Sequence, residues 1–116
     1  MNNDYHKYRV WSVEEKQYVS MWVFVNYLGE VCRTRNGCIY PHKCEVEECT
    51  GLKDKNGTLI YEGDVVLFVG KVNLAVQYTP NEWEMAGDDV NVPLTENTAR
   101  FVKIVGNIHE EGWKNG

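Results

Sequence analysis

Four cysteines fall within one short window of the sequence, and thiols grouped in this way could bind a metal ion or form disulfides. The window holds Cys32, Cys38, Cys44 and Cys49, with His42 among them. Thiolates and an imidazole could together hold a tetrahedral zinc ion. Structural zinc sites usually take two ligands from a Cys-x2-Cys turn, whereas five, five and four residues separate these successive cysteines. Disulfides would need an oxidising compartment. We therefore expect free, half-buried thiols with no metal or cofactor, and zinc or a disulfide remain the alternatives.

The sequence shows no arrangement that is typical of a catalytic site. His6 and His109 lie near opposite ends of the chain, and no Ser or Cys stands in a nucleophile elbow. A Gly-rich phosphate-binding loop is also missing from the sequence. Acidic pairs such as Glu47-Glu48 are neighbours, and neighbours in a strand point to opposite faces, so they seldom converge. We therefore expect no catalytic residues and no enzymatic activity.

Composition and charge are those of a small, acidic globular protein. The 116 residues are 43% hydrophobic and 25% charged, which predicts a single domain over residues 1–116. The net charge of −5 divides into +2 for residues 1–43 and −7 for residues 44–116. Net acidity opposes contact with phosphate backbones. A locally basic surface remains possible near Arg9, Arg33, Arg35 and Lys43.

Neither a membrane segment nor a secretory signal can be recognised. The longest apolar stretch, residues 21–25, has the length of a strand and is far below the ~20 residues that span a bilayer. The N-terminal residues contain no basic region followed by an apolar run. These patterns predict a cytoplasmic protein with no membrane partner.

Short strands separated by turns account for most of the chain. β-Branched and aromatic residues predict strands at residues 8–11, 18–25, 65–69, 72–78 and 101–105. Asn56-Gly57 and Gly63-Asp64 predict tight turns, because glycine adopts the backbone shapes that side chains disfavour. The absence of a long helical pattern then favours a mainly β fold, a small SH3-like barrel or roll of short antiparallel strands with irregular loop insertions.

Three other segments lack the pattern of a regular strand. Residues 26–49 form a variable, cysteine-rich segment in this interpretation, and residues 110–116 form a frayed tail. We interpret residues 88–98 as a loop, because they are polar and contain Pro93.

Acidic residues accompany the two predicted turns. Asp54, Glu62 and Asp64 each lie beside a glycine turn or within one. Side-chain oxygens at such positions accept hydrogen bonds from nearby backbone amides. We therefore expect these residues to hold the turns, and not to form an acidic ligand site.

Aromatic residues are the best candidates for a binding surface. Small barrels bind ligands along exposed aromatic faces and loops. The candidates are Tyr27, Tyr40, Tyr78 and Trp83. Packing in the core is the alternative interpretation for Tyr78 and Trp83, because alternating strands bury about half of their side chains.

The run from Thr50 to Val66, which contains both turns, resembles the signature of the YopX-like proteins of phages and prophages. Tyr8-Arg9-Val10-Trp11 is similar to the opening strand of that family. Val76-Gln77-Tyr78 followed by Trp83 resembles its middle hairpin, and residues 104–110 resemble its closing strand. The resemblance implies a β-rich domain of SH3-like barrel type that acts in a bacterial host cell. It implies no catalytic residue and no ligand.

Two functions from different classes follow from these observations. The preferred hypothesis is a phage- or prophage-encoded, non-enzymatic accessory protein, a protein–protein interaction module that binds a host or phage protein. The alternative is a nucleic-acid-binding accessory factor in phage replication or regulation, which net acidity disfavours. Exposed strand edges would also permit homo-oligomers.

Overall fold

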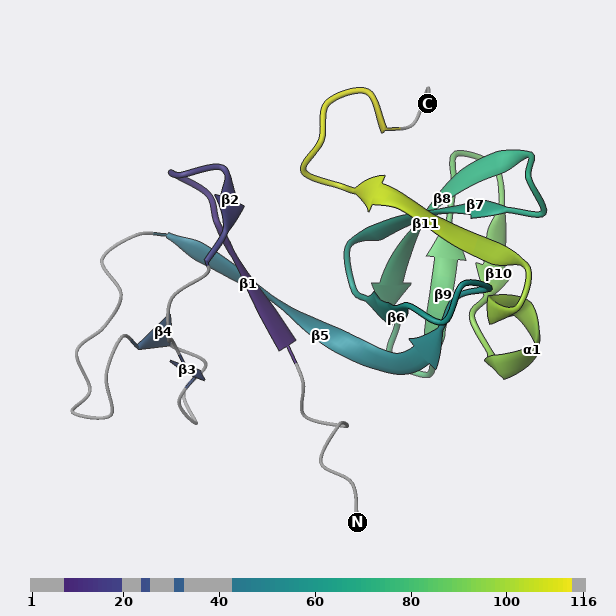
Figure 1. Cartoon of the computed structure of the whole chain (residues 1–116), viewed down its shortest axis with the longest axis horizontal. Helices are drawn as coiled ribbons and strands as arrows, with labels where there is room; N and C mark the ends of the chain where they lie inside the picture. The colour runs from purple at the N-terminus through teal and green to yellow at the C-terminus, as the bar shows by residue number, and fades with distance from the viewer. Residues whose placement is uncertain (1–7, 20–23, 26–30, 33–42, 114–116) are drawn as a thin grey trace, which may run out of the picture. The chain divides into compact units, whose positions relative to one another are not determined.

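The computed structural model describes residues 8–19, 24–25, 31–32 and 43–113. Internal contacts divide the chain into two compact units, one formed by Arg9–Glu47 and a larger one formed by Glu48–Gly116 with Met1–Tyr8 (Figure 1). Strand β5 (Cys44–Lys53) contributes residues to both units. Among the described residues, no helix has the length and apolar character needed to cross a membrane.

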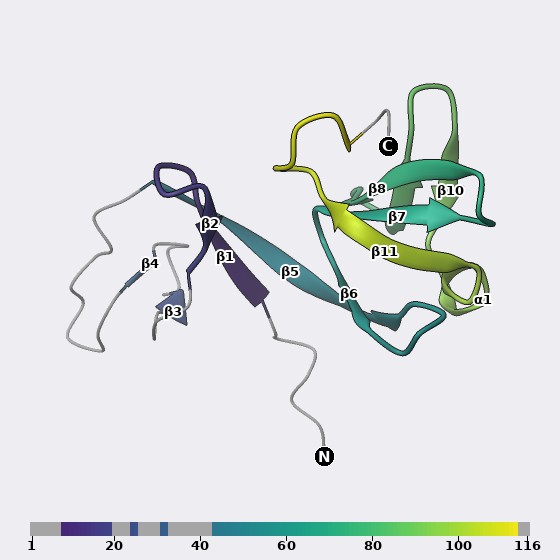
Figure 2. The same cartoon turned by 45° about the horizontal axis from the view of Figure 1, so that its top comes forward.

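The larger unit is built on a curled antiparallel sheet. The sheet has five strands in the order β10-β9-β8-β7-β11, and its curl is visible in Figures 1 and 2. The C-terminal part of β5 pairs with β6 beside this sheet. The elements are β6 (Leu59–Tyr61), β7 (Asp64–Phe68), β8 (Val72–Tyr78), β9 (Trp83–Ala86), β10 (Asn91–Pro93), α1 (Glu96–Ala99) and β11 (Val102–Asn107).

One face of the curled sheet carries the core of the larger unit. Alternation along β8 buries Leu74 and Val76, and Met85 lies opposite Val76 on β9. The sheet therefore folds round a continuous apolar cluster, as expected for strands with one buried face. The buried members of the cluster are Ile60, Val66, Leu74, Val76, Met85, Leu94, Ala99 and Val102.

The Asn56-Gly57 turn is held by the buried carboxylate of Asp54. Gly57 has a φ of 83°, the left-handed conformation expected of a turn glycine. Asp54 Oδ1 accepts hydrogen bonds from the backbone N–H groups of Asn56 and Thr58, each at 2.9 Å. Asp54 Oδ2 accepts a third, from the N–H of Ile104 at 3.1 Å. The same side chain therefore closes the turn and joins it to β11.

These contacts set the ionisation of Asp54. Burial alone would raise the pKa of the Asp54 carboxyl, but hydrogen bonds from the backbone of Thr58, Ile104 and Asn56, with the charge of Lys55, bring it below its ordinary value. The carboxylate form is the one that accepts all three N–H groups.

The Gly63-Asp64 turn joins three parts of the larger unit. Gly63 has a φ of 87°, its N–H donates to the carbonyl of Val76 at 2.9 Å, and its carbonyl accepts from the N–H of Ile108 at 2.9 Å. Asp64 Oδ2 accepts from the N–H of Tyr61 at 2.7 Å. The prediction that Asp54, Glu62 and Asp64 hold the turns is therefore confirmed for Asp54 and Asp64, whereas the Glu62 side chain accepts a hydrogen bond from the N–H of Glu48 on β5.

The smaller unit contains two hairpins. Strand β1 (Tyr8–Ser12) pairs with β2 (Gln17–Tyr18), and β3 (Phe24–Val25) pairs with β4 (Val31–Cys32). The Ser12 hydroxyl accepts from the N–H of Glu15 at 3.1 Å and closes the first hairpin. The small apolar cluster of this unit consists of Val10 and Val31, with Val19, Cys44 and Val46 packed against them.

The interpretation of residues 88–98 as a loop is wrong. Strand β10 and helix α1 both lie in this segment. Pro93 is at the end of β10, which is an edge strand, where a missing N–H is tolerated. Thr95 and Thr98 form a capping box that starts α1, a signal that a search for Glu or Gln at the third helical position does not detect. Ala99 of this helix is buried in the core.

The predicted fold class is confirmed at the level of a mainly β chain with a curled barrel or roll of short antiparallel strands. The finer SH3-like description stays a prediction, as does a single domain over residues 1–116.

Within the segment predicted to be a frayed tail, Trp113 is half-buried, and its carbonyl accepts a hydrogen bond from Asn73 Nδ2 at 3.0 Å.

Candidate binding pocket

Tyr78 and Trp83 form a cross-strand pair where β8 and β9 meet their connecting turn. The two residues are partners in the antiparallel register, and their ring centroids lie 4.9 Å apart in an edge-to-face arrangement with an interplanar angle of 64°. Tyr78 follows Val76 by two positions on β8, and Trp83 precedes Met85 by two positions on β9, so both rings share the core face of the sheet. Trp83 packs against the core, whereas the side chain of Tyr78 is 58% exposed. The pair therefore extends the core outward to the surface.

A hydrogen-bonded turn fixes the two strand ends. The N–H and the hydroxyl of Thr79 both donate to the carbonyl of Glu82, each at 2.8 Å. The Thr79 hydroxyl oxygen also accepts from the N–H of Glu82 at 3.1 Å. Because these bonds close the turn locally, Tyr78 and Trp83 are held in place before any ligand binds.

An irregular part of β5 supplies another side of the pocket. The pairing of β5 with β6 shifts between Cys49 and Lys53, and Gly51 within the shift has a φ of 82°. The Thr50 hydroxyl donates to the carbonyl of Ile60 at 2.8 Å and ties the irregular segment to β6. A Cβ atom built on Gly51 meets nothing within 4 Å. The bulge therefore leaves open space beside the backbone.

These elements enclose a pocket of about 520 Å³ in the larger unit. Its lining combines two aromatic rings with two carboxylates, and none of its described lining residues is basic. The Glu62 side chain accepts from the N–H of Glu48 at 3.4 Å, and the N–H of Glu62 donates to the carbonyl of Glu48 at 2.9 Å. These two hydrogen bonds keep the acidic residues adjacent. The lining residues are Glu48, Cys49, Thr50, Gly51, Glu62, Tyr78 and Trp83.

The structure therefore brings together two of the four predicted binding residues. Tyr78 and Trp83 line the pocket, whereas Tyr27 and Tyr40 lie outside the residues that the structure describes. The sequence analysis missed Glu48 and assigned Glu62 only to turn chemistry. In the structure Glu47 is buried and Glu48 is exposed on β5, and no sequence signal told these two neighbouring acidic residues apart.

Neither Cys44, which is half-buried, nor Cys49, which is buried, forms a disulfide. Burial raises the pKa of the Cys44 thiol above its ordinary value, and the carboxylates of Glu15 and Glu14 raise it further. The side chain of Cys32 and the whole of Cys38 and His42 lie outside the described residues. The zinc alternative, which needs several of these groups, therefore stays a prediction.

Arg9 takes part in a partly buried ion pair, which limits the predicted basic surface. Its Nε donates to Glu47 Oε1 at 2.7 Å, and its guanidinium carbon lies 4.5 Å from the centroid of the Tyr18 ring. The Tyr18 hydroxyl donates to the same carboxylate oxygen at 2.9 Å. Arg33 and Arg35, two other members of that predicted surface, lie outside the described residues.

Comparison with known proteins agrees with the resemblance seen in the sequence. The family model of the YopX protein matches residues 7–112, which is most of the chain. The chain belongs to the YopX family. Every lining residue of the pocket lies within the part that matches the YopX model.

The YopX chain also has a neighbour among solved structures, protein EF1440 from Enterococcus faecalis. The two are 18% identical with a TM-score of 0.65, over 89% of this chain and 92% of the neighbour. Because the sequence identity is low, this structural likeness shows a shared fold and nothing more. Among curated proteins, no match was found.

Proposed function

We propose that this YopX-family protein is a phage- or prophage-encoded, non-enzymatic accessory protein that binds a partner protein through the pocket beside Tyr78. The observation that carries the proposal is an exposed tyrosine, placed edge-to-face with a tryptophan that the core holds, at the mouth of a hollow of about 520 Å³. Pre-positioned aromatic rings beside a pocket are typical of the residues that dominate protein–protein binding.

The charges near the pocket support a protein partner over a nucleic acid. Base stacking on Tyr78 would bring phosphate groups toward the carboxylates of Glu48 and Glu62, which would repel them. Within the smaller unit, the guanidinium of Arg9 forms an ion pair with Glu47. The nucleic-acid alternative therefore has less support from the charges of the described residues.

Site-specific photo-crosslinking tests the proposal. A photoreactive phenylalanine analogue at Tyr78 is compared with the same analogue at Phe101, because these aromatic side chains are 58% and 57% exposed and carry no charge. We expect a discrete crosslinked protein from host or infected cells at position 78 and not at position 101. Excess unlabelled protein should suppress that band, whereas excess Tyr78→Ala protein should not.

Three outcomes of this experiment are informative. The same crosslinked proteins at both positions would contradict a specific site at Tyr78. Crosslinking of a second copy of the chain would identify the surface as a homo-oligomer interface. Crosslinking to DNA or RNA would favour the alternative function.

A further inference from the structure

We propose that the pocket binds an arginine side chain on a basic segment of the partner protein. This inference rests on the proposed function, because it names the chemistry that the Tyr78 surface recognises. Three features of the pocket carry it: its charge, its aromatic rings and the open space at Gly51.

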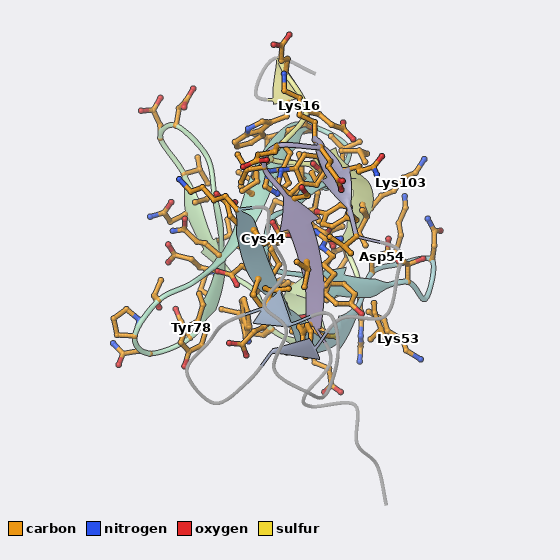
Figure 3. The ribbon with its side chains drawn as sticks, turned by 90° about the vertical axis from the view of Figure 1, so that its left-hand side faces the viewer. Lys16, Cys44, Lys53, Asp54, Tyr78 and Lys103 are labelled. Atoms are coloured by element: carbon orange, nitrogen blue, oxygen red, sulfur yellow. The ribbon has the colours of Figure 1, made fainter. Side chains whose placement is uncertain are left out.

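The charge of the pocket favours a cation. Glu48 is exposed and Glu62 is half-buried, their backbones are joined by the N–H of Glu62 and the carbonyl of Glu48, and no described lining residue is a lysine or arginine. Both acidic residues line the same pocket, so a cation that enters it is attracted by their negative charge. Figure 3 shows two lysines of the same unit, Lys53 and Lys103, on the opposite side from Tyr78.

The aromatic pair favours arginine among the biological cations. In the edge-to-face pair with Trp83, the largely exposed ring of Tyr78 can offer a face to a planar guanidinium. A guanidinium also presents several N–H donors in one plane, which can reach both carboxylates while it stacks. An ammonium group offers a single point of charge and cannot stack in this way.

The bulge in β5 provides room for the segment that carries the arginine. Gly51 has no side chain, and the space beside its Cα is open. A partner backbone can therefore approach β5 closely at this point and direct its side chain between Glu62 and Tyr78. A standard strand with a side chain at this position would narrow that approach.

Titration of the isotope-labelled, full-length protein with short peptides tests the inference by NMR. The peptide acetyl-Gly-Gly-Arg-Gly-Gly-amide is compared with peptides that carry lysine or citrulline in place of arginine. Citrulline has nearly the shape of arginine and no charge. The indole N–H signal of Trp83 reports on the pocket, and those of Trp11 and Trp113 serve as internal controls. We expect the Trp83 signal to shift with the arginine peptide, less with lysine and least with citrulline.

Charge-neutralising variants define the site. Glu48→Gln and Glu62→Gln should each weaken arginine-peptide binding about fivefold, the size of one solvent-accessible ion pair. Glu84→Gln is the matched control: Glu84 follows Trp83 directly on β9, and its side chain accepts a hydrogen bond from Gln77 at 2.6 Å on the other face of the sheet. Its effect should be less than twofold. Higher salt should weaken binding to the wild-type protein, because it screens exposed charges.

Equal affinity for the arginine and citrulline peptides would overturn the inference, as would equal effects of Glu84→Gln and Glu48→Gln. The photo-crosslinking result separates this failure from failure of the proposed function. If Tyr78 still crosslinks a specific protein while no peptide shifts Trp83, the pocket binds a partner by other chemistry. If both experiments are negative, the proposed function fails as well.

Discussion

Removal of the Asp54 carboxylate is expected to destabilise the larger unit and to alter its dependence on pH. Asp54→Ala leaves three backbone N–H groups without their acceptor. The amides of Asn56 and Thr58 belong to exposed turn residues and can turn to water, whereas Ile104 is half-buried in β11. A hydrogen bond to a charged group contributes about 1.5–3 kcal/mol, and bonds that water can replace contribute less, so we expect a loss of about 2–4 kcal/mol.

The pH dependence follows from the lowered pKa of Asp54. A carboxyl group whose pKa is lower in the folded state stabilises the fold fully above its unfolded pKa, which is about 3.9 for aspartate. That contribution is lost as the pH falls below this value toward the folded pKa. The difference in free energy of unfolding between wild type and Asp54→Ala should therefore be largest near neutral pH and should narrow below about pH 4.

Urea unfolding followed by tryptophan fluorescence, at several pH values between about 7 and 3, measures this difference. Asp89→Ala serves as the control, because Asp89 is an exposed aspartate of the same unit and its removal should change stability by less than about 0.5 kcal/mol. A loss at Asp54 no larger than that at Asp89 would refute the reasoning. So would a difference that stays constant across the acid range in which the protein remains folded.

Three further predictions concern residues whose role is set by backbone shape, an ion pair or burial. Gly63→Ala should lower stability by about 1–3 kcal/mol, because φ at this position is 87°; an unchanged melting temperature would contradict this. Glu47→Ala should lower the free energy of unfolding by about 1–3 kcal/mol, because it removes the partner of Arg9. A change close to zero in thermal unfolding, at both low and high salt, would show that the ion pair contributes little. Cys44 should react with iodoacetamide more slowly in the folded than in the denatured protein near pH 8, because burial and the Glu15 carboxylate raise the pKa of its thiol. Peptide mapping after timed alkylation measures this rate, and Glu15→Gln should increase it.

The sequence predicts the turns and strands of the larger unit well, because their signals are local. Gly57 and Gly63 occupy left-handed conformations that few other residues adopt without strain, so their positions mark the turns directly. Leu74, Val76 and Met85 alternate with more exposed residues, and this period of two identifies both the strands and their buried face. Helix α1 has no comparable signal, because four residues are too few to show a helical period.

The pocket could be predicted only in part, because it depends on pairing between distant strands. Tyr78 and Trp83 are close in sequence and share a hairpin, so aromatic residue type and alternation were enough to select them. Glu48 and Glu62 become neighbours only through the pairing of β5 with β6. Nothing in the local sequence distinguishes Glu48 from a solvated surface charge, and the shift in strand register that sets its position cannot be read from composition.

The family signature from Thr50 to Val66 therefore lines the pocket as well as fixing the turns. Asp54, Gly63 and Asp64 fix the turns, while Glu62 and Gly51 from the same run line the pocket. Substitutions in the run should thus affect stability and ligand binding together. Tyr78 lies outside the run and is largely exposed, so Tyr78→Ala should change the free energy of unfolding by no more than about 1 kcal/mol, the size of an aromatic cross-strand contact. As an unlabelled competitor, the Tyr78→Ala protein should fail to suppress the partner crosslink formed at position 78. A Tyr78→Ala protein that is as unstable as Gly63→Ala would show that the aromatic pair is a structural element of the fold, and the pocket would then lose its main support as a binding site.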